Sequence, residues 1–289
     1  MSEQINTALH WGCERIEDCS DSARLDAELL LAHCLHKPRS YLYSWPEKAL
    51  SDSCWQQFQD LVWRRIKPTP VAYLLGSREF YSMAFTINPS VLVPRAETEL
   101  LVDLALRYCP TDSKLNVLEL GTGSGVVAIT LKQQRPLASI LATDIDPDCI
   151  SLAQDNALQH NLDIEFIESN WFSHVPPATA FDLIVSNPPY IAAHHPFLAL
   201  GDLPAEPAIA LSPGETGLEA LQIIVSQAGK YLVAGGMLML EHGYDQQAAM
   251  RELLENQAYN NINCTFDSND LPRVSFGRKP GGTDEIPGR

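Results

Sequence analysis

The residue types best suited to chemistry occur together after an apolar run at 181–186, in the order Asn187, Pro188, Pro189 and Tyr190. Proline fixes the backbone angle φ and donates no N–H group, so a backbone carbonyl here stays available as an acceptor. The Asn187 side chain both accepts and donates hydrogen bonds, and the Tyr190 ring offers a flat face for stacking. These groups suit a planar –NH₂ group, either a carboxamide or the exocyclic amine of a base. Asn-Pro is also an ordinary turn signal, so the tetrapeptide alone does not establish a site.

A glycine-rich loop lies upstream, where the apolar run 116–120 leads into Gly121, Thr122, Gly123, Ser124 and Gly125. Glycine has no Cβ, so the chain can turn tightly and a ligand can lie against the backbone. A helix that follows such a loop directs its free N–H groups toward it. The spacing is Gly-x-Gly-x-Gly, not the spacing of the dinucleotide fold, and the acidic Glu119 precedes it. Such a loop can also be a tight turn without a ligand.

Asp144 ends a second apolar run, 139–143, nineteen residues after Gly125. An acidic residue in this position is where a ribose diol is held by charge-assisted hydrogen bonds. Aspartate also begins helices, and Asp146 stands directly before Pro147, a residue type common at the first helical position. We therefore expect Asp144 to bind a ribose and Asp146 to cap the next helix. The order of the three signals along the chain is more specific than any one of them.

In this order the motifs resemble those of S-adenosylmethionine-dependent methyltransferases that modify planar amino or amide nitrogens. The closer similarity is to the HemK-type enzymes, which act on the glutamine amide of peptide-chain release factors. It covers nearly the whole chain, and beyond the motifs above it is carried by 64–65, 70–76, 80–85, 91–100, 169–172, 201–202, 206–207, 240–243 and 273–278. The segment 94–99 favours the release-factor enzymes over a sister family that methylates a glutamine of a ribosomal protein.

The resemblance implies methylation of the glutamine side-chain amide in the Gly-Gly-Gln motif of a release factor. Release factors act in translation termination. It implies that the Asn187 oxygen and the Pro188 carbonyl accept hydrogen bonds from the substrate –NH₂, and that Tyr190 stacks on the amide. Catalysis then comes from orientation and local electrostatics, with no metal. Pro189 completes the implied substrate-binding set. The implied cofactor-binding residues are Gly121, Thr122, Gly123, Ser124, Gly125, Asp144, Trp171 and Asn187.

The formal net charge of −16 bears on the choice of substrate. Nucleic-acid binding draws its affinity from clustered Lys and Arg, so this charge argues against a nucleic-acid substrate and favours a protein partner with basic patches. The same charge also serves solubility. An enzyme that methylates the amine of adenine or guanine remains an alternative, and it would require base extrusion and a basic cleft. A cofactor-binding scaffold without activity is a further alternative, against which the Asn187 and Tyr190 side chains argue.

The bulk properties predict a cytoplasmic enzyme. The chain has no run of 18 apolar residues and no basic-then-apolar start, so we expect neither a membrane span nor a signal peptide. Its seven cysteines are odd in number and scattered, as expected for reduced thiols.

The length of 289 residues predicts two domains. Residues 1–80 form the predicted helical substrate-recognition domain, with helices at 22–35 and 54–66. Residues 81–94 are predicted to form a connecting β-hairpin. From 95 to 279 we expect an α/β, Rossmann-like, doubly wound methyltransferase sheet, with ligands at the carboxyl ends of its strands. We expect the loop 191–217 to act as a lid or to contact substrate, and 280–289 to be a disordered tail. The predicted strands are 116–120, 139–143, 164–168, 181–186 and 236–241, followed by an antiparallel pair at 261–266 and 273–276.

Overall fold

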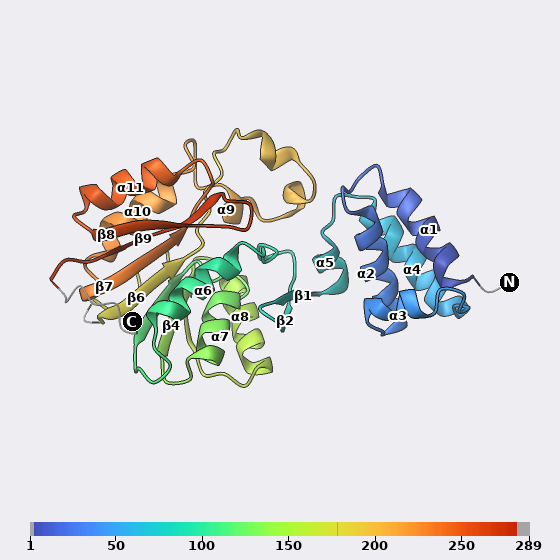
Figure 1. The fold of residues 1–289 in the computed structure, drawn as a ribbon, viewed down its shortest axis with the longest axis horizontal. Helices are drawn as coiled ribbons and strands as arrows, with labels where there is room; N and C mark the ends of the chain where they lie inside the picture. The colour runs from blue at the N-terminus through green and yellow to red at the C-terminus, as the bar shows by residue number, and fades with distance from the viewer. Residues whose placement is uncertain (1–2, 178, 282–289) are drawn as a thin grey trace. The chain divides into compact units, whose positions relative to one another are not determined.

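The computed structural model describes residues 3–177 and 179–281, which form two compact units (Figure 1). The first unit comprises the residues up to Arg78 together with Ile87–Pro89 and Pro196–Glu206. The second unit comprises Glu79–Thr86, Ser90–His195 and the residues from Pro207 onward. Of the tail predicted from residue 280 onward, residues 282–289 lie outside the described residues. No helix in the described part of the chain is long and apolar enough to cross a membrane.

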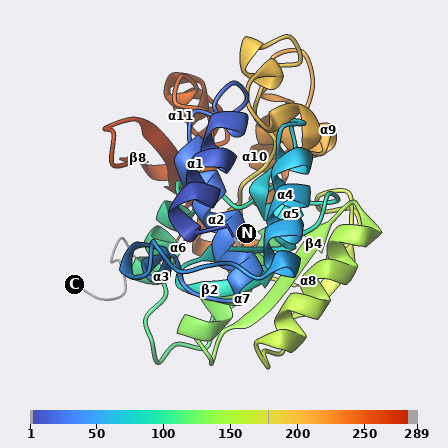
Figure 2. The same cartoon turned by 90° about the vertical axis from the view of Figure 1, so that its right-hand side faces the viewer.

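The first unit is helical, and Figure 2 shows α1, α2 and α4 side by side. Its core is apolar, and Gly12 allows α1 to approach α4, because a Cβ there would lie 2.7 Å from the Phe58 ring. The Ser51 side chain accepts a hydrogen bond from the Cys54 N–H and begins α4. The helices are α1 (Ile5–Ile16), α2 (Ala23–Leu35), α3 (Arg39–Ser44), α4 (Asp52–Arg65) and α5 (Val71–Leu75).

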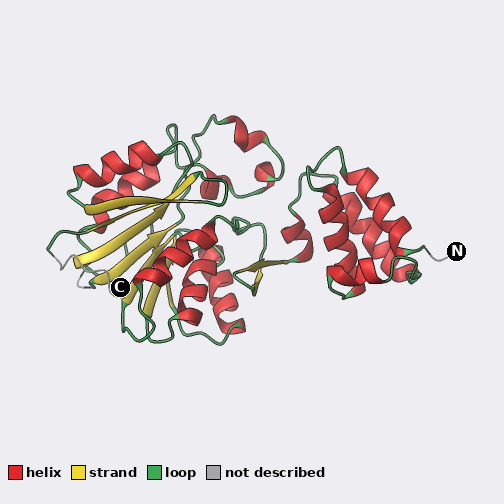
Figure 3. Cartoon of the chain, in the orientation of Figure 1, coloured by secondary structure: helices red, strands yellow, loops and turns green. Residues whose placement is uncertain are grey.

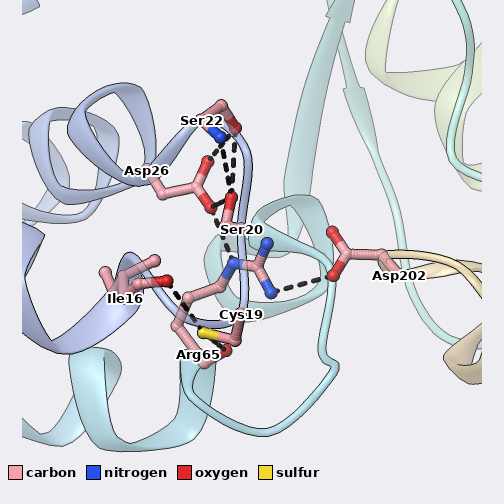
Figure 4. A network of polar contacts seen from close by, with 7 residues as sticks. All are labelled: Ile16, Cys19, Ser20, Ser22, Asp26, Arg65 and Asp202. Atoms are coloured by element: carbon pink, nitrogen blue, oxygen red, sulfur yellow. Dashed lines mark hydrogen bonds and ion pairs between the residues drawn. The ribbon is translucent and has the colours of Figure 1, made fainter.

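A buried arginine ties part of the long loop to this helical unit (Figure 4). Arg65, which is 3% exposed, donates from Nε to Asp26 and from a terminal nitrogen to Asp202, each at 2.8 Å. The Asp26 carboxylate also accepts hydrogen bonds from the hydroxyls of Ser20 and Ser22. Because a buried guanidinium is costly without partners, Arg65 fixes the position of Asp202. The segment Pro196–Glu206, with short 3₁₀ turns at Pro196–Ala199 and Leu203–Ala205, therefore belongs to the first unit.

A β-hairpin follows α5, with strands β1 (Ser77–Phe80) and β2 (Met83–Thr86). Its turn residues Tyr81 and Ser82 have φ of 52° and 59°, the left-handed conformation that joins the two strands tightly. The paired strands thus begin earlier in the chain than the predicted hairpin at 81–94. Asn156, fully buried on α8 (Pro147–Gln159), exchanges hydrogen bonds with the Thr86 backbone and donates to the Ser124 carbonyl, which connects β2 to the glycine-rich loop.

The second unit contains a seven-stranded sheet in the order β5-β4-β3-β6-β7-β9-β8 (Figures 1 and 3). The first five strands of that order are parallel, and β9 is antiparallel to both β7 and β8. The predicted doubly wound sheet and its antiparallel end are confirmed. The strands are β3 (Asn116–Leu120), β4 (Ser139–Asp144), β5 (Glu165–Glu168), β6 (Phe181–Ser186), β7 (Leu232–Glu241), β8 (Asn260–Phe266) and β9 (Pro272–Arg278).

Helices cover both faces of this sheet, with α6, α7 and α8 on one face and α10 and α11 on the other (Figures 1 and 3). Strand residues two apart, such as Leu118 and Leu120 on β3 and Leu238 and Leu240 on β7, share the core that contacts α10 and α11. The helices are α6 (Thr98–Tyr108), α7 (Val126–Gln134), α8 (Pro147–Gln159), α9 (Ala208–Leu211), α10 (Glu219–Ala228) and α11 (Gln247–Asn256).

The buried Arg65 provides a test of what holds the first unit together. Arg65→Met should lower the free energy of unfolding by about 3 kcal/mol, because it leaves the Asp26 carboxylate buried without a counter-ion. Urea unfolding followed by tryptophan fluorescence measures this loss, since Trp11, Trp45, Trp55 and Trp63 all belong to this unit. Arg64→Met, at the exposed neighbouring position, is the control and should leave stability almost unchanged. Equal losses of unfolding free energy in the two variants would contradict the conclusion that the buried Arg65 stabilises the first unit.

Candidate active site

The glycine-rich loop and Asn187 leave the sheet at the same edge because of strand register. β3 and β6 are parallel neighbours, and their last paired residues are Leu120 and Ser186. The Ser186 hydroxyl also donates to the Leu120 carbonyl at 2.6 Å, which holds the two strand ends together. Gly121 and Asn187 follow directly. This is the point at which the strand order reverses, where ligands bind in open α/β sheets.

Asp144 is held against the glycine-rich loop from the next strand. The Thr122 N–H donates to the Thr143 carbonyl, and the Gly123 N–H donates to the Asp144 carboxylate, both at 2.8 Å. The Asp146 side chain accepts from the Asp148 N–H and caps α8, which confirms the predicted cap. Asp146 thus has a structural role, while Asp144 lies at the edge of the sheet where Gly121 and Asn187 follow their strands.

A cavity of about 300 Å³ opens at this edge of the sheet, within the second unit. Its volume is in the range of small-molecule sites. Three predicted site residues, Gly125, Pro188 and Tyr190, are not among its lining residues. The predicted residues that do line it are Gly121, Thr122, Gly123, Ser124, Asp144, Trp171, Asn187 and Pro189.

The glycines of the loop serve two different purposes. Gly121 has φ of 70°, and a Cβ on it would lie 3.7 Å from the Trp171 ring, so the indole lies beside the loop backbone. Gly125 has φ of 82°, and a Cβ there would lie 2.9 Å from the Ile129 side chain and 3.1 Å from Ala153. Gly125 therefore permits the packing of α7 against α8, whereas Gly121 lines the cavity.

Acidic side chains outnumber basic ones in the cavity lining. Burial raises the pKa of Asp144, although the N–H groups of Gly123 and Asp146 oppose that rise. Burial also raises the pKa of Glu119 to about 8, even though its carboxylate accepts from the Thr122 hydroxyl at 2.6 Å and from the Ala128 N–H at 3.0 Å. Among the described residues of the lining, the acids are Glu119, Asp144, Asp146 and Glu219, and the single basic residue is Arg95.

The Asn187 carboxamide is fixed from α6. Its Nδ2 donates to the Thr98 hydroxyl at 3.0 Å, and both residues line the cavity. Tyr190 is held separately: its hydroxyl donates to Glu241 at 3.3 Å, and its backbone carbonyl accepts from Gln246 at 2.9 Å. Burial, and then the charge of Glu241, raises the pKa of Tyr190. The hydroxyl end of the tyrosine is therefore directed at Glu241.

Sequence reasoning did not single out Thr98 or Glu241. Thr98 belongs to a segment that carried the family resemblance, but it is 89 residues from Asn187, and no local pattern links the two. The sequence also did not predict that α9 contributes Ile209 and Ala210 to the cavity. The length of the loop that contains α9 was the available signal.

Comparison with known proteins agrees with this architecture. Two family models match: the PrmC N-terminal domain over residues 7–76 and the Methyltransferase small domain over residues 97–202. The release factor glutamine methyltransferase of Shewanella oneidensis is 42% identical over 281 residues, covering 96% of this chain and 98% of that protein. The enzyme of that name from Vibrio cholerae is 42% identical over 283 residues, with the same coverage. A methyltransferase structure from Pyrococcus furiosus shares the fold, with a TM-score of 0.54 at 18% identity over 70% of this chain and 91% of that chain.

Glu119 predicts a pH dependence of stability. Its pKa in the folded protein, about 8, is above the ordinary value of 4.5, so the stability it contributes is present at low pH and is lost as pH rises through about 8. Between pH 5.5 and 8.5 the parent should lose on the order of 3 kcal/mol more than Glu119→Gln, at roughly 1.4 kcal/mol per pKa unit. Calorimetry of both proteins across this range, without ligand, measures the difference. Parallel curves would show that Glu119 is ionised throughout.

Proposed function

Because the chain belongs to the family of release factor glutamine methyltransferases, we propose that it methylates the side-chain amide of a glutamine in a peptide-chain release factor, with S-adenosylmethionine as methyl donor. The observation that carries the proposal is the placement of the Asn187 carboxamide on the same cavity as the glycine-rich loop and Asp144. On this proposal, Asn187 would receive the planar –NH₂ group beside the adenosyl group of the donor.

The charges of the cavity favour this donor over a phosphate-bearing cofactor. S-adenosylmethionine carries a sulfonium and an ammonium, which the carboxyl groups of the lining attract. A pyrophosphate at the glycine-rich loop would instead lie close to the Asp144 carboxylate. The residues fit the donor as follows: Asp144 would accept hydrogen bonds from the ribose, Trp171 would pack on the adenine, and the backbone at Gly121 and Gly123 would lie beside the methionine part.

The residues of this chain would act mainly by orientation. Bound S-adenosylmethionine supplies a methyl carbon on a good leaving group. The lone pair of an amide nitrogen is delocalised, so catalysis requires alignment and stabilisation of developing positive charge more than a strong base. The Asn187 oxygen and the Pro188 carbonyl would accept the two amide hydrogens, with Tyr190 beside the planar group. The substrate nitrogen would take up the methyl group as the carbon–sulfur bond of the donor breaks, and it would then release a proton to solvent.

The first unit and the net charge support a protein substrate. A factor that works on ribosomal RNA carries basic surface, and a net charge of −16 attracts it while repelling free nucleic acid. We assign substrate recognition to the helical first unit, which the PrmC N-terminal domain model matches, and the reaction to the cytoplasm. Labelled S-adenosylmethionine offered in parallel with release factor, ribosomal protein, DNA and RNA tests the choice. Label confined to the release-factor glutamine supports the proposal, and label on any other substrate alone would refute it.

Asn187→Ala should lower the rate of methyl transfer to the release factor by about 100-fold, the scale of one lost preorganised polar contact. Single-turnover transfer with saturating donor isolates this effect from binding. The donor affinity, measured in parallel, serves as the control for an intact cavity. Near-normal turnover would exclude the role assigned to Asn187.

Asp144→Ala should act mainly on the cofactor. We expect the affinity for S-adenosylmethionine to fall by about tenfold or more, because a charge-assisted hydrogen bond to the ribose is removed. Isothermal titration calorimetry measures the change. An unchanged affinity would refute the ribose assignment.

A further inference from the structure

The tetrapeptide that ends at Tyr190 leads directly into the loop 191–217, and this loop folds back onto its own start. The Ile191 N–H donates to the carbonyl of Leu211 at 3.0 Å. Leu211 is the last residue of α9, and Ile209 of the same helix lines the cavity. The tetrapeptide and one wall of the cavity are therefore joined through a single closed loop.

Gly217 brings the far end of this loop against Tyr190. Gly217 is buried and has φ of 77°, and a Cβ on it would lie 2.5 Å from the Tyr190 carbonyl oxygen and 2.9 Å from the Ala192 nitrogen. The two backbone segments lie so close that no side chain fits between them. Because glycine contributes no side chain to this contact, polar groups from another part of the chain have to hold it.

The Gln246 side chain supplies these polar groups. Its Nε2 donates to the Tyr190 carbonyl at 2.9 Å and to the Gly217 carbonyl at 3.3 Å. Its Oε1 accepts from the Gly243 N–H at 2.9 Å, and its own backbone N–H donates to the Gly243 carbonyl at 2.9 Å. Gln246 directly precedes α11, so the turn between β7 and α11 holds the carboxamide against both ends of the loop.

The polarity of this contact is fixed by backbone groups. A backbone N–H can only donate and a carbonyl can only accept, so the Gly243 N–H requires the oxygen of Gln246 and the two carbonyls require its –NH₂ group. Rotation of the carboxamide by 180° would place a donor against a donor and acceptors against an acceptor. An ionised glutamate would offer two acceptors in the same shape, and methionine would offer the same length without a donor.

We propose that Gln246 is a positioning residue for methyl transfer, which holds the tetrapeptide 187–190 in place through the Tyr190 carbonyl. This inference rests on the proposed function, in which the tetrapeptide receives the substrate amide. Gln246 is not among the residues that line the cavity, so it acts through Tyr190 and Gly217. Tyr190 is then held at two points by one short segment, since Glu241 accepts from its hydroxyl and Gln246 donates to its carbonyl.

The contact should govern the rate of transfer more than the binding of the methyl donor. The glycine-rich loop and Asp144 are held by hydrogen bonds between β4 and the loop itself, to which Gln246 does not contribute. Loss of the contact leaves the Tyr190 carbonyl without this donor and frees the end of the tetrapeptide. A small displacement of a group that orients the reacting nitrogen is costly, because the reaction depends on alignment.

The test compares two substitutions of Gln246 that have similar length. Gln246→Met removes all hydrogen bonds of the side chain, whereas Gln246→Glu keeps the acceptor for the Gly243 N–H and presents a carboxylate to two carbonyls. We expect kcat for release-factor methylation to fall about tenfold in Gln246→Met and about 30-fold or more in Gln246→Glu. The affinity for S-adenosylmethionine should stay within about threefold of the parent in both. Gln247→Glu makes the same change of charge one residue later, on α11, and is the matched control.

The order of the two variants separates the proposed contact from a local role in the turn at Gly243. If only the turn mattered, Gln246→Glu would match the parent and Gln246→Met would be the slower protein. That order overturns the proposal, and so does an unchanged kcat in both variants or a loss of donor affinity as large as the loss of kcat. Absence of methyl transfer by the parent would instead refute the proposed function, so the two failures are distinguishable.

Discussion

The parallel pairing of β3 with β6 is the constraint on which the rest of the site depends. Because Leu120 lies opposite Ser186, the chain leaves both strands at one level, and Gly121 and Asn187 meet at the same edge. One loop is shaped by glycines for close approach of a ligand, and the other by prolines that leave carbonyls free. Shifting the register would separate the two receptors, so the sheet core that fixes the register also fixes the distance between them.

Three acids, Asp144, Glu119 and Glu241, lie near this junction, and each accepts hydrogen bonds from a different set of donors. Asp144 and Glu119 accept backbone N–H groups of the loop and of α7, while Glu241 accepts from the Tyr190 hydroxyl. Burial raises the pKa of all three. In the proposed function, the Asp144 carboxylate beside the glycine-rich loop attracts the cationic methyl donor.

Much of this arrangement could be predicted from the sequence, because its signals are local. Apolar runs predicted the strands, and the glycine-rich turn, the acid that ends β4 and the Asn-Pro pair each follow a strand. The remainder depends on pairs of residues far apart in the chain. Thr98 meets Asn187 across 89 residues, and Arg65 meets Asp202 across 137, which assigns part of the predicted lid to the helical unit. No periodicity or spacing reports such contacts.

The most direct measurement is a structure of the protein with S-adenosylhomocysteine and an intact release factor. We predict that the Asn187 oxygen and the Pro188 carbonyl each lie about 2.7–3.2 Å from the nitrogen of the Gly-Gly-Gln side chain. Asn187 Nδ2 should remain on Thr98, and the glutamine nitrogen should face the sulfur of the cofactor product. A glutamine bound elsewhere in the cavity, or an Asn187 side chain turned away from it, would contradict the account.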